Sequence, residues 1–239
     1  MYKARTYRSW TVEGDLVFFE VIEKETDLAI YAKRDLERQA RAAVLTLRQE
    51  IEDYIRLDRR FFESLDPVEI MAGAPQIVRA MASAARRASV GPMASVAGAV
   101  AEAVGRELSQ HSEEIIVENG GDIFLATAGK RSLGIYAGEG SPYTGKLAIE
   151  VGPAPDGLGV CTSSGTVSHS LSFGKSDAVV IISEDAALAD AAATAAGNIV
   201  RSPDDIPKGI ERARSIDGVM GVLIIAGDKM GSWGDVRLI

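Results

Sequence analysis

The sequence is poor in the residues that build most metal and redox sites. Its 239 residues include one cysteine, Cys161, so no intrachain disulfide can form and no Cys-x-x-Cys pair exists. A single cysteine fits a reducing compartment. Only two histidines occur, His111 and His169, which argues against a histidine-rich zinc site. Neither a Gly-x-Gly-x-x-Gly fingerprint nor a Walker A loop is present.

Long apolar runs and basic clusters are also missing. No apolar segment approaches the length that crosses a membrane, and residues 1–15 contain no apolar signal core. The formal net charge is −8, which disfavours a broad phosphate-binding surface. No basic stripe suggests nucleic acid. We therefore expect a soluble, cytoplasmic protein with no nucleic-acid or membrane partner.

Glycine is scarce in the first part of the chain. Of 24 glycines, only Gly14 and Gly73 precede residue 91. Residues 1–90 are charged, with strands and helices, whereas 91–239 contain the turns and short strands that glycine favours. We interpret 1–239 as a single domain with these two portions.

The hydrophobic pattern alternates between groups of strands and groups of helices. Helices are expected at 34–65, about 75–88, 92–108, 187–198 and 206–215. Strands cluster between these helices, and a hairpin-like meander precedes the first helix. Clustered strands favour an α+β fold with antiparallel sheets over a parallel βαβ sheet. The order also suggests a duplicated unit.

The first candidate segment for chemistry is "ENGGD", residues 118–122, between two strands. One interpretation is a type I′ hairpin turn, because Asn-Gly is the preferred pair there. The other is a binding turn, in which two glycines let a ligand approach the backbone beside Asn119 and Asp122. The sequence leaves both open.

The second segment is "CTSSGTVSHS", residues 161–170, with six hydroxyl side chains, one glycine and His169. Such a loop suits short hydrogen bonds to a polar ligand or phosphate. The alternative is a solvated Ser/Thr loop. Cys161 itself is interpreted as a small core residue, since nothing near it in sequence would activate a thiol.

The third segment is the alanine-rich "ALADAAATAAGN", residues 187–198. Asp190 and Thr194 are four residues apart and lie on one face of the expected helix. They could supply two oxygen ligands to Mg²⁺, which completes its octahedron with water and substrate phosphates. Alternatively, Asp190 faces solvent and Thr194 bonds back to a carbonyl one turn earlier.

Together, and in this order, the segments resemble the ApbE-like superfamily, whose best-known members are flavin transferases. The resemblance covers residues 85–239 through "GPMASVAGAVAEAVG", "ENGGDIFL", "GVCTSSGTVSHSLSFGKSDAVV" and "ALADAAATAAGN", and is closest to a shorter uncharacterised branch. It implies a tunnelling-type α+β fold (T-fold-like), with antiparallel sheets backed by helices and an internal duplication.

The resemblance also implies roles for particular residues. Asp190 and Thr194 match the metal ligands of a D-x-x-x-T helix, and His169 matches a histidine of the site that could act in catalysis. The positions expected to bind the flavin nucleotide are Asn119, Gly120, Gly121, Asp122, Thr162, Ser163, Ser164, Gly165 and Ser168. The resemblance implies all of them except Asn119 and Thr162, which come from the turn and the hydroxyl-rich loop themselves.

The implied activity acts on FAD with Mg²⁺ as cofactor. AMP leaves, and the FMN moiety passes to a threonine of an acceptor protein or to water. Two features depart from the transferases: the Asp-Pro-x-Thr-Gly turn after Ser-His is missing, and Ala97-Gly98 replaces a Lys-Gly pair. The alternatives are a non-catalytic binding module for a flavin, nucleotide or pterin-like ligand, and an assembly protein, such as a homodimer, with thin helices.

Overall fold

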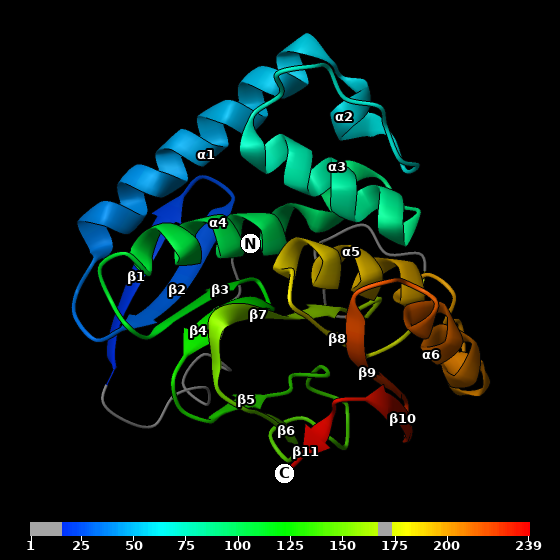
Figure 1. The fold of residues 1–239 in the computed structure, drawn as a ribbon. Helices are drawn as coiled ribbons and strands as arrows, with labels where there is room; N and C mark the ends of the chain where they lie inside the picture. The colour runs from blue at the N-terminus through cyan, green and yellow to red at the C-terminus, as the bar shows by residue number, and fades with distance from the viewer. Residues whose placement is uncertain (1–15, 167–173) are drawn as a thin grey trace.

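The centre of the molecule is an eight-stranded antiparallel sheet, seen in a computed structural model that describes residues 16–166 and 174–239 (Figure 1). Its strand order is β1-β2-β3-β4-β7-β8-β9-β10. These strands are β1 (Val17–Glu23), β2 (Thr26–Ala32), β3 (Ile115–Asn119), β4 (Asp122–Thr127), β7 (Ala154–Ser163), β8 (Ala178–Ser183), β9 (Val219–Ala226) and β10 (Lys229–Gly234). A smaller sheet has the order β11-β6-β5 and consists of β5 (Arg131–Gly134), β6 (Ala148–Val151) and β11 (Arg237–Leu238).

The helices lie on one face of the large sheet, and the small sheet lies on the other (Figure 1). The helices are α1 (Glu37–Leu57), α2 (Arg60–Glu63), α3 (Gln76–Ala88), α4 (Val96–Leu108), α5 (Ala186–Gly197) and α6 (Ile206–Arg214), with 3₁₀ turns η2 (Pro92–Ser95) and η3 (Pro203–Asp205) before α4 and α6. No single described helix is long and apolar enough to span a bilayer. Only α3 taken with η2 and α4 passes that test, as a pair bent by 102°.

Alternation along the strands divides the interior into two cores. In β3, the side chains of Ile115 and Val117 join the helix-side core, while Ile116 joins the core against the small sheet. This is the two-residue period of a strand buried on both faces. A side chain on the helix side of the central strands β3, β4, β7 and β8 therefore meets α4 or α5.

The same order of elements occurs twice along the chain. The hairpin β1–β2, helices α1 to α4 and the hairpin β3–β4 are followed by β7–β8, α5–α6 and β9–β10. In each unit the helices connect two antiparallel neighbours in the sheet. The expected α+β architecture with antiparallel sheets is confirmed, and the repeated order fits the implied duplication.

One element expectation is wrong. The single helix expected over 34–65 ends at Leu57, because Asp58 adopts an extended conformation (φ −139°, ψ 95°). The Asp58 side chain accepts a hydrogen bond from the backbone N–H of Arg60 at 3.1 Å, which offers the backbone a local alternative to the helix. The turn also buries Phe61 edge-on against Tyr54, with ring centroids 5.1 Å apart.

Candidate functional site

Helix α5 lies against the middle of the large sheet and is almost wholly buried. All of its residues are buried except Asp190 and Thr194, which are partly exposed on the same face. Alanine and glycine are needed because the contact is close: a Cβ built on Gly159 of β7 would lie 2.4 Å from the Cα of Ala186. The expected helix is confirmed, and its two oxygen-bearing side chains share its one partly open face.

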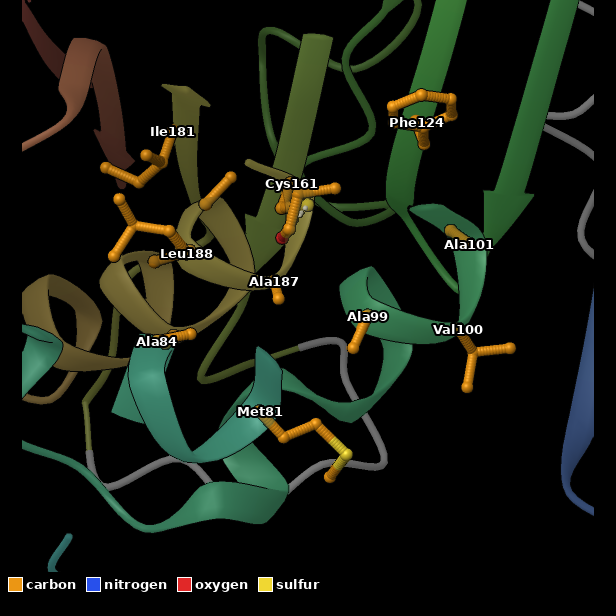
Figure 2. Close-up of a cluster of buried hydrophobic side chains, with 14 of the residues drawn as sticks. Met81, Ala84, Ala99, Val100, Ala101, Phe124, Cys161, Ile181, Ala187 and Leu188 are labelled. Atoms are coloured by element: carbon orange, nitrogen blue, oxygen red, sulfur yellow. Dashed lines mark hydrogen bonds between the residues drawn. The ribbon is translucent and has the colours of Figure 1, made fainter. Parts of the chain in front are cut away.

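The apolar surroundings of α5 also contain the single cysteine. Figure 2 shows Ala84 of α3 with Ala187 and Leu188 of α5 in one cluster, where the two helices pack, and Cys161 beside them on β7. The Cys161 thiol is fully buried and donates to the carbonyl of Ala186 at 3.3 Å. Burial, then the nearby carboxylates, raise its pKa well above the ordinary value. Cys161 is therefore a core residue with an unreactive thiol.

Asp190 joins α5 to the first turn of α4. Its Oδ2 accepts a hydrogen bond at 2.9 Å from the N–H of Gly98, the third residue of α4. Burial raises the pKa of Asp190 to about 7, although the N–H groups of Gly98 and Ala97 lower it. The interpretation in which Asp190 merely faces solvent is wrong, because this carboxylate caps a neighbouring helix.

Thr194 does not follow the expected alternative of bonding back to the helix. Its hydroxyl has no hydrogen-bond partner among the residues that the structure describes. Thr46 of α1 shows what such a bond looks like, since its Oγ1 donates to the Ala42 carbonyl at 3.1 Å. The Thr194 hydroxyl is thus available to a ligand on the face that carries Asp190.

The segment "ENGGD" forms the tight turn between β3 and β4. Asn119 pairs with Asp122 across the hairpin, and Gly120 and Gly121 between them have φ of 70° and 104°. Positive φ at both central residues is what a type I′ turn requires, with Gly-Gly rather than Asn-Gly as its central pair. The Asn119 side chain donates to the Ala97 carbonyl at 3.2 Å and so links this turn to the start of α4.

A second carboxylate, that of the buried Asp122, interacts electrostatically with Asp190. Oδ1 of Asp122 accepts from the backbone N–H of Thr162 at 3.2 Å. Burial, followed by the charge of Asp190, raises the pKa of Asp122 well above its ordinary value. Neither Asp122 nor Asp190 has an ion-pair partner within the described ranges. Among the described residues, these two carboxylates therefore have no basic side chain to balance their charge.

Strand β7 presents its two site residues on opposite faces. The Ser163 hydroxyl faces α5, 3.8 Å from the position a Cβ would take on Gly197, whereas Thr162 lies beside Gly121 of the hairpin turn. Ser164 is buried and accepts from the N–H of Thr166 at 3.2 Å. A ligand on the helix side would therefore meet the side chain of Ser163 and not that of Thr162.

The rest of the hydroxyl-rich loop is described only in part. The N–H of Gly165 donates to the Ser176 carbonyl at 2.9 Å, which closes the base of the loop. The Ser176 hydroxyl is buried and has no hydrogen-bond partner among the described residues. Ser168 and His169 lie outside the described residues, so their binding and catalytic roles stay predictions.

Sequence reasoning missed Glu102 of α4. Its Oε2 accepts from the backbone N–H of Ala186, the first residue of α5, at 2.7 Å. A signal was present, because Glu102 is the only charged residue in the otherwise small and apolar stretch 96–105. A single carboxylate on an apolar helix indicates a specific partner in the core.

The described residues do not form a closed metal cage. No three His, Cys, Asp or Glu side chains within 16–166 and 174–239 are grouped so as to hold a metal ion. A surface hollow of 460 Å³ lies among Arg60, Glu63, Ser64, Pro67, Val68 and Glu69 and includes none of the site residues. One or two carboxylates with a hydroxyl fit Mg²⁺, which relies on water and substrate phosphates for its other ligands.

Comparison of the sequence identifies its relatives. The family model described as "AbpE bacteria" matches residues 8–219. A UPF0280 protein of Methanococcus aeolicus is 43% identical over 202 residues, covering 82% of this chain and 81% of its own length. A UPF0280 protein of Methanocaldococcus jannaschii is 40% identical over 222 residues, covering 90% of both chains.

Solved structures share the fold at much lower identity. The apo flavinyl transferase ApbE of Pseudomonas stutzeri aligns with a TM-score of 0.55 at 14% identity, over 92% of this chain and 94% of its own. The ApbE protein of Thermotoga maritima aligns with a TM-score of 0.61, also at 14% identity, over 90% and 96%. These two structures are similar to this chain in fold.

Proposed function

We propose a flavin-nucleotide function for this chain, which belongs to the family described as "AbpE bacteria". The substrate is FAD, a divalent cation such as Mg²⁺ assists, and the pyrophosphate bond breaks. The FMN moiety passes to a threonine of an acceptor protein or to water, and AMP is the leaving group. The shared fold of proteins called flavinyl transferases supports this proposal. So does the agreement between the motif positions and the geometry around Asp190.

One observation carries the proposal: Asp122 and Asp190 are neighbouring carboxylates, and neither is paired with a basic side chain of the described residues. The Thr194 hydroxyl, which has no partner in the part of the chain that the structure describes, lies on the same helix face as Asp190. A divalent cation would neutralise the two acids, take oxygen from Asp190 and Thr194, and leave positions for phosphate oxygens. When bound, Mg²⁺ would supply charge neutralisation at the pyrophosphate.

The chain's own residues provide the orientation. The N–H groups of Ala97 and Gly98 hold the Asp190 carboxylate at the start of α4. Gly120 and Gly121 keep the hairpin turn thin, so that a ligand can approach its backbone. The Asn119 side chain donates to the Ala97 carbonyl and so links that turn to the start of α4.

The test follows AMP and FMN after incubation of the pure protein with FAD and Mg²⁺, with and without threonine-containing acceptor peptides. The Asp190→Asn variant removes the charge yet keeps an acceptor for the Gly98 N–H, so we expect a folded protein without turnover. The matched control is Asp185→Asn on the same helix, because asparagine also caps helices well. This control should retain activity.

Thr194 gives a second arm of the same experiment. Thr194→Val should weaken cation binding without a loss of stability, because its hydroxyl has no hydrogen-bond partner within residues 16–166 and 174–239. Thr46→Val on α1 is its control and should leave turnover unchanged. Equal AMP release by the wild type and Asp190→Asn, across several divalent metals, would overturn the proposal.

Binding without cleavage is the second candidate function, and one observation favours it. Asp190 already has a structural partner in Gly98, so its presence does not by itself require a reacting group. In this case FAD or FMN binds saturably in equilibrium dialysis while no AMP appears with any acceptor. An absence of saturable flavin binding would exclude both functions.

A further inference from the structure

Helices α4 and α5 cap each other with carboxylates. Asp190 of α5 accepts from the N–H of Gly98 on α4 at 2.9 Å, and Glu102 of α4 accepts from the N–H of Ala186 on α5 at 2.7 Å. Gly98 and Glu102 are four residues apart, and so are Ala186 and Asp190. Each helix therefore contributes one N–H group of its first turn and one carboxylate, a single turn apart, to hydrogen bonds with the other helix.

The two bonds act across a very close contact. A Cβ built on Gly98 would lie 2.2 Å from the Ala186 carbonyl oxygen and 2.9 Å from the Asp190 Cβ. Small changes in the relative position of α4 and α5 would therefore change the Asp190–Gly98 distance directly. The hydrogen bond between Glu102 and Ala186 joins the same two helices and opposes a movement of α5 relative to α4.

Glu102 is itself held in place and neutralised. Its Oε1 accepts from Nε of Arg106 at 2.7 Å, and the Arg106 guanidinium lies 5.2 Å from the centre of the Phe124 ring. Asp190 stands in the same relation to the opposite helix but has no basic partner in the described ranges. The Glu102 carboxylate, paired with Arg106, thus holds the two helices together. The Asp190 carboxylate, without a basic partner in the described ranges, lies at the candidate cation site.

Helix α5 does not need Glu102 in order to begin. Asp185 already caps it, since its Oδ1 accepts from the N–H of Leu188 at 2.9 Å. The additional bond from Glu102 to Ala186 instead joins α5 to another element. The Glu102–Ala186 hydrogen bond therefore affects the position of α5 relative to α4 and is not required for α5 to form.

We propose that Glu102 is a positioning residue: by fixing Ala186 against α4, it sets the place of the Asp190 carboxylate one turn later. The inference rests on the proposed function, in which Asp190 binds the cation. The Glu102–Ala186 bond then acts on the cation through Asp190, as partners of metal ligands commonly do.

The first test measures Mn²⁺ affinity by calorimetry on the full chain, with Mn²⁺ alone as the probe. Glu102→Ala should weaken binding on the order of tenfold, and Glu102→Gln should restore it, because its amide oxygen can still accept from Ala186. Asp185→Ala is the stability control. It removes a helix cap and lowers the melting temperature while leaving Mn²⁺ affinity within about twofold.

The second test needs no cation. Amide hydrogen exchange at Gly98 should quicken in Glu102→Ala but not in Asp185→Ala, because only the former loosens the Asp190–Gly98 bond. Glu107→Ala, an exposed site on the same helix, should change neither readout.

The outcomes separate the two proposals. If the wild type binds Mn²⁺ and Asp190→Asn does not, yet Glu102→Ala binds as the wild type does with unchanged Gly98 exchange, the positioning role is wrong and the cation site stands. Equal losses in Glu102→Ala and Asp185→Ala would also overturn it. A wild type that binds no Mn²⁺ would overturn the cation site and the positioning role together.

Discussion

Asp190 shows how one side chain acquires an unusual pKa from its surroundings. Its neighbours are backbone N–H groups, which favour the charged form, and a second acid, Asp122, with which it interacts electrostatically. Burial outweighs the hydrogen bonds, because no cationic side chain compensates it in the described structure. The result is a carboxyl that changes its charge near neutral pH.

The raised pKa of Asp190, about 7, predicts a specific pH dependence of stability. A folded-state pKa above the unfolded value of 3.8 stabilises the protein below pH 4, and this contribution is lost as the pH rises toward 7. Without added metal, the free energy of unfolding of the wild type should fall by on the order of 1–2 kcal/mol more than that of Asp190→Asn between pH 4 and 8. Urea unfolding at several pH values measures it.

Mg²⁺ provides the companion measurement. Because the cation binds the deprotonated acid, it should restore stability to the wild type at pH 8 and not at pH 5. Identical pH profiles for the wild type and Asp190→Asn would contradict the assigned pKa.

At the scale of elements, the contact between α4 and α5 depends on a glycine whose role is steric. Gly98 permits the approach of the Ala186 carbonyl, whereas Gly197, at the end of α5, has room: a Cβ there would meet its nearest atoms at 3.7–3.8 Å. Gly98 and Gly197 therefore have different environments and should respond differently to substitution by alanine.

Gly98→Ala should destabilise the protein. Alanine in a helix gains about 1 kcal/mol over glycine, but overlap with a backbone carbonyl costs roughly 1–3 kcal/mol or more, so the overlap wins. Gly197→Ala, its matched control, should be neutral or stabilising because its Cβ fits. Thermal unfolding of both variants tests this, and equal changes in melting temperature would refute the steric account.

At the scale of the whole molecule, the candidate site lies where the repeated units meet. Asp122 follows the first unit's hairpin turn, and Asp190 comes from the second unit's helix. Cys161 on β7 is buried under α5 at this junction. Access to its thiol therefore reports on opening of the centre of the fold.

Cys161 should resist alkylation in the folded protein. Its thiol is fully buried, so the reagent cannot reach it in the folded protein. Burial also raises the pKa of Cys161 well above the ordinary value, so little of the reactive thiolate is present. Iodoacetamide labelling at pH 8 should be slow without urea and rise in parallel with global unfolding, as followed by circular dichroism. Rapid labelling at zero urea would show that this centre opens locally.

Much of the local structure was predictable from residue order alone. Alanine-rich 187–198 forms a helix whose one partly open face carries Asp190 and Thr194, and "ENGGD" forms a tight turn, because both depend on neighbours within four residues. The helix expected over 34–65 failed at Asp58, where the acid's bond to Arg60 and the burial of Phe61 compete with a continuous amphipathic pattern.

The sequence by itself determined which residues share a helix face or a turn, since periodicity and turn chemistry act over short separations. Only the tertiary structure decided what faces them. Asp190 meets Gly98 across 92 positions and Glu102 meets Ala186 across 84. Such pairs leave no periodic trace, because they depend on how close two helices approach, and that distance is set by the packing of small residues in the shared core.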